Sequence, residues 1–513
     1  MADRAVDFRR LLGQGRNVLR PESVIETGDA VKVPSIKPLL FLSLGLAAWI
    51  DFGSLHDLDN ADAVIPVLMS LNKLTPFYWD QDRFGALVPL LAVPVKHPYW
   101  NLQLQWFLNA FAGVFSFVLG ARYLFPTREW PLIALAGIGL YFGLTPLDFR
   151  FHYLGPEPYA LGMTLGFGAL LVTPPTASSA VRLLIATVLM LLAHWINIGL
   201  FLILLPVVLA LATASRLTRA RNGVGQYVIG IVIIIVGALG GFLMKLLFAT
   251  QRTTLGFSSP NAWLWGWRSL LQGVLSGLSQ FWLSLAVIAG AGLILTCAPR
   301  GRNERKARVL PPLLLVAASI FYSLLVGMSA WVEDNAYSSR YLHPAVLIVQ
   351  AAVVALLIVP LSSYLGDRVL RKLSIAAAVI VLVAAGIGFG LPSASRVREQ
   401  VARIDPVTLD VLSARCTHVA GEYWNVWPIV YRASLALFER GERRPIYGLA
   451  GRSAPTVDAA KAVPLEQMRI ALLPTPDGEG ERWLRTYDFP PLMEIERRGT
   501  LIVLEPVRSA DRK

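Results

Sequence analysis

The sequence predicts an all-α polytopic membrane protein that carries a small α/β domain at its C-terminal end. Three observations lead to this fold class. The chain of 513 residues is 55% hydrophobic and only 16% charged, with a mean hydropathy of +0.55, whereas soluble domains carry about 25% charged residues. Apolar runs long enough to cross a bilayer recur between residues 38 and 391, and residues 393–513 contain no such run.

Eleven apolar segments are expected to form spanning helices, since a span needs roughly 20 mostly apolar residues. They are 38–55, 101–121, 130–147, 158–173, 180–194, 196–213, 226–248, 271–296, 309–331, 344–361 and 374–391. The short pair 180–194 and 196–213 is either two spans or a re-entrant pair. The run 84–95 is too short to span, and we expect it to form a helix at the membrane interface.

The distribution of Lys and Arg predicts the orientation in the membrane. With the N-terminus inside, the inner loops carry fourteen of these residues and the outer loops seven. The net charge of +13 is therefore mostly a topology signal and not a nucleic-acid signature. We expect a cytoplasmic segment 1–37, a transmembrane domain 38–392 whose first periplasmic loop is 56–100, and a periplasmic domain 393–513.

Familiar cofactor motifs are missing from the sequence. It contains no P-loop, no Gly-rich nucleotide motif and no metal-ligand spacing, which argues against an ATP-driven pump. The external domain is expected to combine a helix at 430–440 with strands at 469–473, 492–496 and 500–505.

The first outer loop concentrates carboxylates. Residues 62–72 are expected to form a short amphipathic helix, with Asp59 and Asp62 on one face at its N-terminal end. A helix N-terminus favours the ionised carboxylate, which is the form that a general base needs. The alternative is that these acids belong to a solvated loop and a helix cap.

The order of several short motifs resembles one family. Asn60-Ala-Asp-Ala-Val-Ile, followed by Phe77-Tyr-Trp-Asp-Gln-Asp-Arg-Phe-Gly, resembles the first periplasmic loop of bacterial GT-C glycosyltransferases. These polytopic enzymes are related to protein mannosyltransferases and aminoarabinose transferases. Four further stretches are similar to family motifs: Gly155-Pro-Glu-Pro-Tyr159, His194-Trp-Ile-Asn197, Ser339-Arg-Tyr-Leu-His-Pro344 and Gly421-Glu-Tyr-Trp-Asn-Val-Trp-Pro428.

The sequence also departs from the family pattern. The first acid of the family's Asp-Glu pair falls on Ala61, so Asp59 and Asp62 both remain candidates for the base. The Gly of the family's Tyr-Gly-Gln is Asp80 here, and the Tyr that follows is Arg83.

The resemblance implies a GT-C-like fold in the bacterial inner membrane, with the active site facing the periplasm. It implies that a monosaccharide moves with inversion from a polyprenyl-phosphate donor to an acceptor hydroxyl on a glycan, a lipopolysaccharide or a protein. The bilayer is the other partner, and no nucleic acid is expected. The resemblance specifies no cofactor, and a divalent cation held by Glu157 with Asp59 or Asp62 stays an open alternative.

Cations are needed to stabilise the departing phosphate. We expect Arg340 first, because arginine binds phosphate bidentately, and then Lys245 and Arg83. In the alternative interpretations, Arg340 pairs with Glu333 or Asp334, and Lys245 extends outward from its span to the interface.

Seven further residues are candidates for binding the substrate or the acceptor. They are Glu157, Asp80, Asp82, Tyr341, His343, Trp195 and Asn197. Glu157 has the alternative role of a helix cap. The aromatic segment 250–270 is either an interface belt or a loop that closes over the sugar or the lipid.

Two other functional classes remain open. A lipid-linked sugar flippase or secondary transporter would show charged residues in mid-bilayer, broken helices in paired positions and an internal repeat, and none of these is evident except the junction at Trp195. A non-catalytic subunit for glycan assembly would not need a first loop rich in acids.

Overall fold

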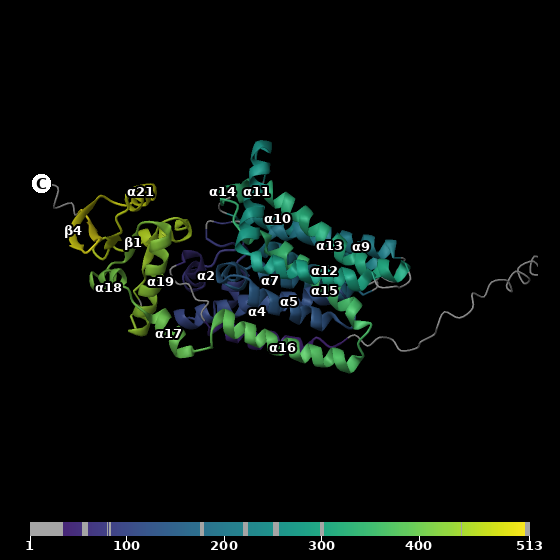
Figure 1. The fold of residues 1–513 in the computed structure, drawn as a ribbon. Helices are drawn as coiled ribbons and strands as arrows, with labels where there is room; N and C mark the ends of the chain where they lie inside the picture. The colour runs from purple at the N-terminus through teal and green to yellow at the C-terminus, as the bar shows by residue number, and fades with distance from the viewer. Residues whose placement is uncertain are drawn as a thin grey trace, which may run out of the picture.

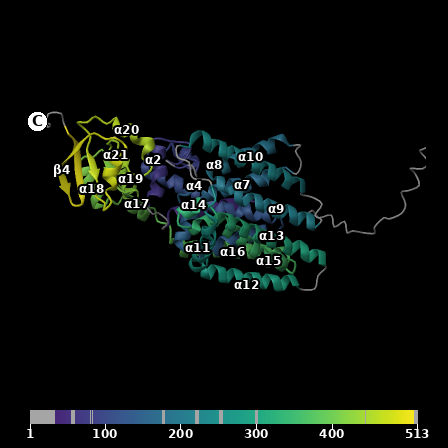
Figure 2. The same ribbon diagram turned by 90° about the horizontal axis from the view of Figure 1, so that it is seen from above.

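A bundle of helices is joined to a small α/β domain, as the computed structural model of the chain shows (Figure 1). It describes residues 34–53, 60–79, 81, 84–174, 179–218, 224–249, 256–297, 302–442 and 444–507. In Figure 1 the C-terminal domain, drawn in yellow and light green, lies at one end of the bundle, and α2 lies between the two. Figure 2, turned by 90°, shows the same arrangement.

The bundle begins at Lys37 and ends at Phe389. Its α-helices are α1 (Lys37–Asp51), α2 (Ala61–Leu71), α3 (Leu87–Ala92), α4 (Pro98–Leu124), α5 (Trp130–Leu144), α6 (Leu147–Leu154), α7 (Tyr159–Val172), α8 (Ala180–Ile196), α9 (Phe201–Leu217), α10 (Val224–Phe248), α11 (Pro260–Gly277), α12 (Ser279–Cys297), α13 (Arg302–Gly327), α14 (Ala330–Asp334), α15 (His343–Ser362) and α16 (Asp367–Phe389). Two short 3₁₀ helices, η1 (Ile198–Leu200) and η2 (Ser339–Leu342), precede α9 and α15.

Seven helical segments within the described residues are long and apolar enough to cross a membrane. They are Pro98–Leu124, Ile198–Leu217, Val224–Phe248, Ser279–Thr296, Lys306–Gly327, Ser339–Ser362 and Asp367–Ala402. Helices also occupy the other expected ranges, as α1, α5, α7 and α8, but these have only 14 to 17 residues. The multi-span character is therefore confirmed, and the count of eleven spans stays a prediction.

Burial separates central helices from peripheral ones. In α4 and α15, 72% of the apolar window is buried, whereas the windows in α10 and α12 are only 28% and 22% buried. Figure 2 shows α10 and α12 at opposite edges of the bundle. Apolar side chains that stay exposed on such helices suit a lipid environment, because the bilayer replaces the protein core as their solvent.

The segment 256–296 differs from the expectation, whereas residues 250–255 lie outside the part of the chain that the structure describes. A helix already begins at Pro260, where proline at the first position is favourable, and a second helix starts at Ser279 after a break at Leu278. Trp263, Trp265 and Trp267 thus belong to a helix and not to a loop; their spacing of two carries no helical periodicity, which is why the sequence did not reveal it.

The C-terminal domain is built on a five-stranded mixed sheet. Its strands are β1 (His418–Ala420), β2 (Tyr447–Leu449), β3 (Ile470–Leu472), β4 (Leu492–Arg498) and β5 (Leu501–Pro506), in the order β2-β1-β3-β5-β4. Strand β1 pairs in parallel with β2 and β3, and β5 pairs antiparallel with β3 and β4. Its helices are α17 (Ala394–Ala402), α18 (Pro406–Ser413), α19 (Tyr423–Glu439), α20 (Val457–Lys461) and α21 (Glu479–Thr486). The expected mixed α/β composition is confirmed.

Candidate active site

The N-terminal end of α2 holds Asp62. Asn60 caps this helix, because its side-chain oxygen accepts a hydrogen bond of 2.9 Å from the Asp62 amide. A buried polar network fastens α2 to α4: Ser70 and Gln105 donate to the same oxygen of Asn101, at 2.9 and 2.8 Å. Asp62 is therefore held at the start of a fixed helix, where the backbone amides favour a negative charge.

Two side chains from the C-terminal domain bind Asp62. The hydroxyl of Tyr423 donates a hydrogen bond of 2.5 Å to Oδ1, and the guanidinium of Arg452 forms an ion pair with the same oxygen. Arg452 also lies over the ring of Tyr423, 4.8 Å from its centroid. Burial lowers the pKa of Arg452, but the charge and hydrogen bond of Asp62, together with Tyr423 and Glu157, raise it by more and leave this pKa above its usual value. Arg452 therefore remains a cation.

A second ion pair joins Glu157, just before α7, to Arg340 in η2. Nη1 of Arg340 donates to Oε1 of Glu157 at 2.8 Å, and the two side chains are only 15% and 6% exposed. Nη2 of Arg340 donates to Asn335 at 3.1 Å and lies 3.4 Å from the hydroxyl of Tyr341. His152 approaches the same Glu157 oxygen at 3.7 Å. The pair thus links residues that are 183 positions apart.

This pairing decides between earlier alternatives. Arg340 pairs with Glu157 instead of Glu333 or Asp334. The N-cap residue of α7 is Pro158, which follows Glu157.

Tyr78 connects the two acidic centres. Burial raises the pKa of its hydroxyl far above the usual value, and the negative charges of Glu157 and Asp62 raise it further. The ring of Phe84 packs edge-on against Tyr78 of the first loop and against Tyr159 at the start of α7, with ring centroids 5.8 and 5.1 Å apart. The first loop, which follows the helix that carries Asp62, thus contacts the segment that follows Glu157.

The first loop also meets the junction between α8 and α9. Phe84 and Asn197 form an antiparallel bridge, and the Gly85 amide donates to the Ile196 carbonyl at 3.2 Å. The indole of Trp195 donates to the carbonyl of Pro76 at 3.1 Å. Two of the motifs recognised in the sequence are thus in direct contact.

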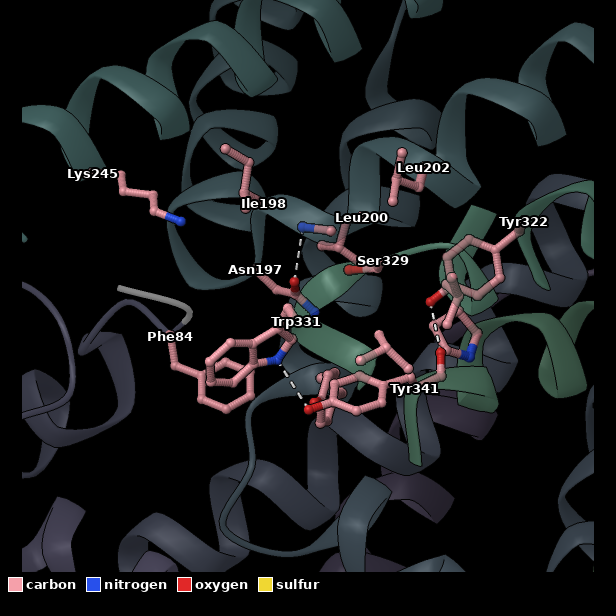
Figure 3. Close-up of a pocket in the computed structure, with 15 residues that line it drawn as sticks. Phe84, Asn197, Ile198, Leu200, Leu202, Lys245, Tyr322, Ser329, Trp331 and Tyr341 are labelled. Carbon is pink, nitrogen blue, oxygen red and sulfur yellow. Dashed lines mark hydrogen bonds between the residues drawn. The ribbon is translucent and has the colours of Figure 1, made fainter. Parts of the chain in front are cut away.

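An apolar cavity opens beside this junction (Figure 3). It holds about 840 Å³ of empty space, part of it open to solvent, and its lining includes Phe84, Tyr159, Asn197 and Tyr341. Lys245 is the one charged side chain among the described residues that line it. Lys245 is only 5% exposed, and Figure 3 shows its amino group pointing towards Asn197 and Phe84. The side chain of Lys245 therefore points into the cavity and not towards the surface of the bundle.

Tyr341 and His343 flank Arg340 at the start of α15. The hydroxyl of Tyr341 accepts a hydrogen bond of 3.0 Å from the indole of Trp331 (Figure 3). The two ring nitrogens of His343 face the carbonyls of Arg340 and Phe149, at 2.6 and 2.7 Å. His343 is 2% exposed, so it supports the backbone that carries Arg340.

Some predicted site residues cannot be placed. Asp59, Asp80, Asp82 and Arg83 lie outside the described residues. Among the residues that the structure describes, no group of three or more His, Cys, Asp or Glu side chains is arranged to hold a metal ion.

Sequence reasoning missed Arg452 and used Tyr423 only as part of a motif. The sole local signal for Arg452 is the turn sequence Ala450-Gly-Arg-Ser453. Nothing in that turn points to a partner 390 residues away.

No protein-family model and no curated protein matches the chain. The structure is similar to the crystal structure of ArnT from Cupriavidus metallidurans bound to undecaprenyl phosphate, with a TM-score of 0.48 and 15% sequence identity. The similarity covers 92% of this chain and 97% of that chain. At 15% identity this similarity concerns only the general arrangement of the chain, and it assigns no role to any residue of the site.

Proposed function

We propose that the chain is an integral membrane glycosyltransferase, which moves a monosaccharide from a polyprenyl-phosphate donor to an acceptor hydroxyl. The main support for the proposal is that the apolar cavity borders buried, positively charged side chains. Tyr341 lines the cavity, and its hydroxyl lies 3.4 Å from Arg340. A lipid-linked donor needs both environments, because its chain is apolar and its phosphate is an anion.

The donor lies with its lipid chain along the apolar wall and its phosphate near the cations. Lys245 supplies a buried positive charge inside the cavity. Arg340 adds a guanidinium, which suits a phosphate because it donates two parallel hydrogen bonds. Arg83 completes the proposed phosphate site. Such cations favour the transition state, where negative charge grows on the departing phosphate.

Transfer occurs by direct displacement at the anomeric carbon. The acceptor oxygen bonds to this carbon while the bond from the carbon to the phosphate oxygen breaks, and the electron pair leaves with the phosphate. The proton of the acceptor passes to a carboxylate, for which Asp62 and Asp59 are the candidates. Attack from the face opposite the phosphate inverts the anomeric configuration.

Glu157 and the residues around it hold the sugar or the acceptor. Tyr341, His343, Trp195 and Asn197 come from elements that border the cavity or the Arg340–Glu157 pair. Asp80 and Asp82 complete the set proposed from the sequence. The acceptor is a glycan, a lipopolysaccharide or a protein.

The reaction takes place on the periplasmic face of a bacterial inner membrane that the chain crosses eleven times. Nucleotide sugars and ATP are not available there. A lipid phosphate solves the problem, because the lipid stays in the bilayer and the phosphate is the leaving group.

A transfer assay in membranes tests the proposal. Synthetic polyprenyl-phosphate monosaccharides carrying mannose, glucose, galacturonate or a pentose are supplied, and the released polyprenyl phosphate is counted. We expect one donor to turn over, and either Asp62→Asn or Asp59→Asn to slow release by about 10²–10⁴-fold, as for the loss of a general base.

Asp367→Asn is the matched control, because Asp367 also binds an arginine, Arg128 at 2.6 Å, but is 84% exposed. It should transfer sugar at the rate of the wild type. The proposal fails if the wild type binds a lipid-linked sugar without ever releasing phosphate and both Asn variants behave alike. A flippase, a secondary transporter or an assembly subunit then becomes the better interpretation.

A further inference from the structure

We propose that Arg452 and Tyr423 are positioning residues for Asp62, so that the C-terminal domain completes the active site. The inference rests on the proposed function and extends it, since it takes Asp62 as the carboxylate that serves the acceptor. It assigns roles to two side chains that lie outside the bundle carrying every other candidate residue.

Both side chains lie just beyond the carboxyl ends of two neighbouring strands of the C-terminal sheet. Tyr423 begins α19, which follows β1, and Arg452 lies in the turn that follows β2. Strands β1 and β2 are parallel, with His418 opposite Tyr447 and Ala420 opposite Leu449. Their carboxyl ends therefore point the same way, and residues that follow parallel strands gather at one edge, where ligands commonly bind.

The turn that carries Arg452 is held rigidly. Oγ of Ser453 accepts a hydrogen bond from the Ala450 amide and lies 2.8 Å from the Ala450 carbonyl. The indole of Trp427 donates to the carbonyl of Gly451 at 3.0 Å. A Cβ built at Gly451 would be in ordinary van der Waals contact with the ring of Tyr423, at 3.4 Å, so the turn lies directly against the start of α19.

Arg452 itself has an uncommon backbone conformation, with φ of +69°. Non-glycine residues rarely occupy this left-handed region. Strain of this kind persists where the surrounding structure enforces it, and it concentrates at functional sites. Here it directs the guanidinium to Asp62.

The C-terminal domain also packs on the bundle next to the contact between Arg452 and Asp62. Trp427, which holds the Arg452 turn, packs against Trp79 of the first loop with ring centroids 5.5 Å apart. Both rings are buried, each about 1% exposed. The same interface that joins α19 to the first loop thus also places Arg452 and Tyr423 on Asp62.

Two donors on one carboxylate oxygen do more than dock a domain. They fix the plane of the carboxylate relative to the acceptor, and the cation keeps it ionised. A carboxylate without this cation would be easier to protonate, because an opposite charge within hydrogen-bonding distance favours the charged form. The side chains of Asp62 and Arg452 are 16% and 20% exposed, so water screens the pair only partly.

The test compares four variants of the full-length protein, using the donor from the synthetic panel that the wild type turns over. Arg452→Gln removes the cation, Arg452→Lys keeps it but loses the planar fork, and Tyr423→Phe removes one hydroxyl. Arg432→Gln is the matched control, because Arg432 pairs with Asp405 at 3.1 Å within the same domain and is 16% exposed. Thermal unfolding of each variant is recorded alongside the kinetics.

We expect Arg452→Gln to lower kcat about 10²-fold, as for a misplaced catalytic group, with KM for the donor unchanged. The acid limb of its pH–rate profile should move up by about one pH unit or more. Arg452→Lys should lower kcat but keep the acid limb of the wild type. Tyr423→Phe should lower kcat about tenfold or more, the worth of a hydrogen bond to a charged group, and Arg432→Gln should leave kcat and the profile unchanged.

The outcomes separate this inference from the proposed function. If the wild type turns over no donor, the proposed function fails. If the wild type is active and Arg452→Lys and Tyr423→Phe match its kcat and profile, Arg452 and Tyr423 are docking contacts only and the inference fails. These two milder variants decide the question even if Arg452→Gln does not fold. The inference also fails if the Arg432→Gln control loses as much kcat and as much unfolding temperature as Arg452→Gln.

Discussion

At the scale of single residues, the Arg340–Glu157 pair shows what burial does to an ion pair. Removing one partner leaves the other as a buried charge without its counter-ion, which costs about 3–5 kcal/mol. Glu157→Ala should therefore lower the thermal unfolding midpoint of the full chain in detergent far more than Asp367→Ala does. The latter breaks a comparable but exposed pair with Arg128, and exposed pairs contribute little. Equal shifts in the two variants would contradict the burial argument.

His418 provides a pH-dependent prediction in the C-terminal domain. Burial lowers its pKa to about 4, although a contact with the Ala460 carbonyl opposes the shift. The unfolded chain binds this proton near the ordinary pKa of 6.5. The unfolded state thus gains protons first as the pH falls, and stability present above about pH 6.5 is lost towards pH 4.

This linkage should cost about 2 kcal/mol between pH 7 and pH 5. Hydrogen exchange of peptides that contain β1 is measured by mass spectrometry on the full chain, and the rates are corrected for the slower intrinsic exchange at lower pH. The resulting protection factors should fall from pH 7 to pH 5. His418→Gln keeps a donor for the Ala460 carbonyl but does not titrate, so its protection factors should vary less with pH. A wild type and a variant with the same pH dependence would refute the assignment to His418.

At the scale of elements, glycines set how closely α8 and α10 approach. A Cβ at Gly241 of α10 would come within 2.8 Å of the His194 carbonyl in α8. Small residues at such contacts allow membrane helices to pack closely. Gly241→Leu should therefore destabilise the protein by about 1–3 kcal/mol, the usual cost of overpacking.

Gly290→Leu in α12 is the control for this prediction, because no described atom lies within 4 Å of a Cβ built at Gly290. Thermal unfolding in detergent should show a lower midpoint for Gly241→Leu and no change for Gly290→Leu. The packing argument is wrong if both variants melt alike.

Elements also show which features of the site could be predicted. The short helix at 62–72 was expected from its apolar spacing and is confirmed as α2. Asp62, Glu157 and Arg340 could be predicted because each lies at the outer end of an expected helix, within a motif that resembles the family pattern. Arg452 lies in a polar turn of a charged domain, where one more arginine carries no pattern. Its partner is fixed by tertiary packing through Trp427, which no local spacing encodes.

At the scale of the whole molecule, the apolar bundle and the C-terminal α/β domain were readable because hydropathy changes sharply near residue 392. The strands β1 and β2 were not expected, because His418 and Gly448 interrupt their apolar residues, whereas the strand expected at 469–473 contains the continuous apolar run Ile470–Leu473. The break at Leu278 falls in the polar run Ser276-Gly-Leu-Ser-Gln280, which the expected span 271–296 included because the residues on both sides are apolar.

The orientation inferred from Lys and Arg leads to a test on the whole molecule. In a chain with Cys297→Ser and Cys416→Ala, Trp424→Cys adds a thiol to the C-terminal domain, where Trp424 is 48% exposed. A membrane-impermeant maleimide should label it once the outer membrane is permeabilised. Arg371→Cys, at an exposed position of α16, should react only after the inner membrane is also opened. If Arg371→Cys is labelled first and Trp424→Cys reacts only after the inner membrane is opened, the orientation inferred from Lys and Arg is wrong.

The cavity beside Lys245 also governs how often the proposed enzyme can act. After transfer, the spent carrier keeps both the lipid chain and the phosphate by which the donor was held, so the same walls retain it as product. Stronger attraction from Lys245 and Arg340 would speed the breaking of the glycosidic bond but lengthen the residence time of the product. Turnover would then depend on how readily the carrier diffuses back into the bilayer, and added polyprenyl phosphate would compete with fresh donor.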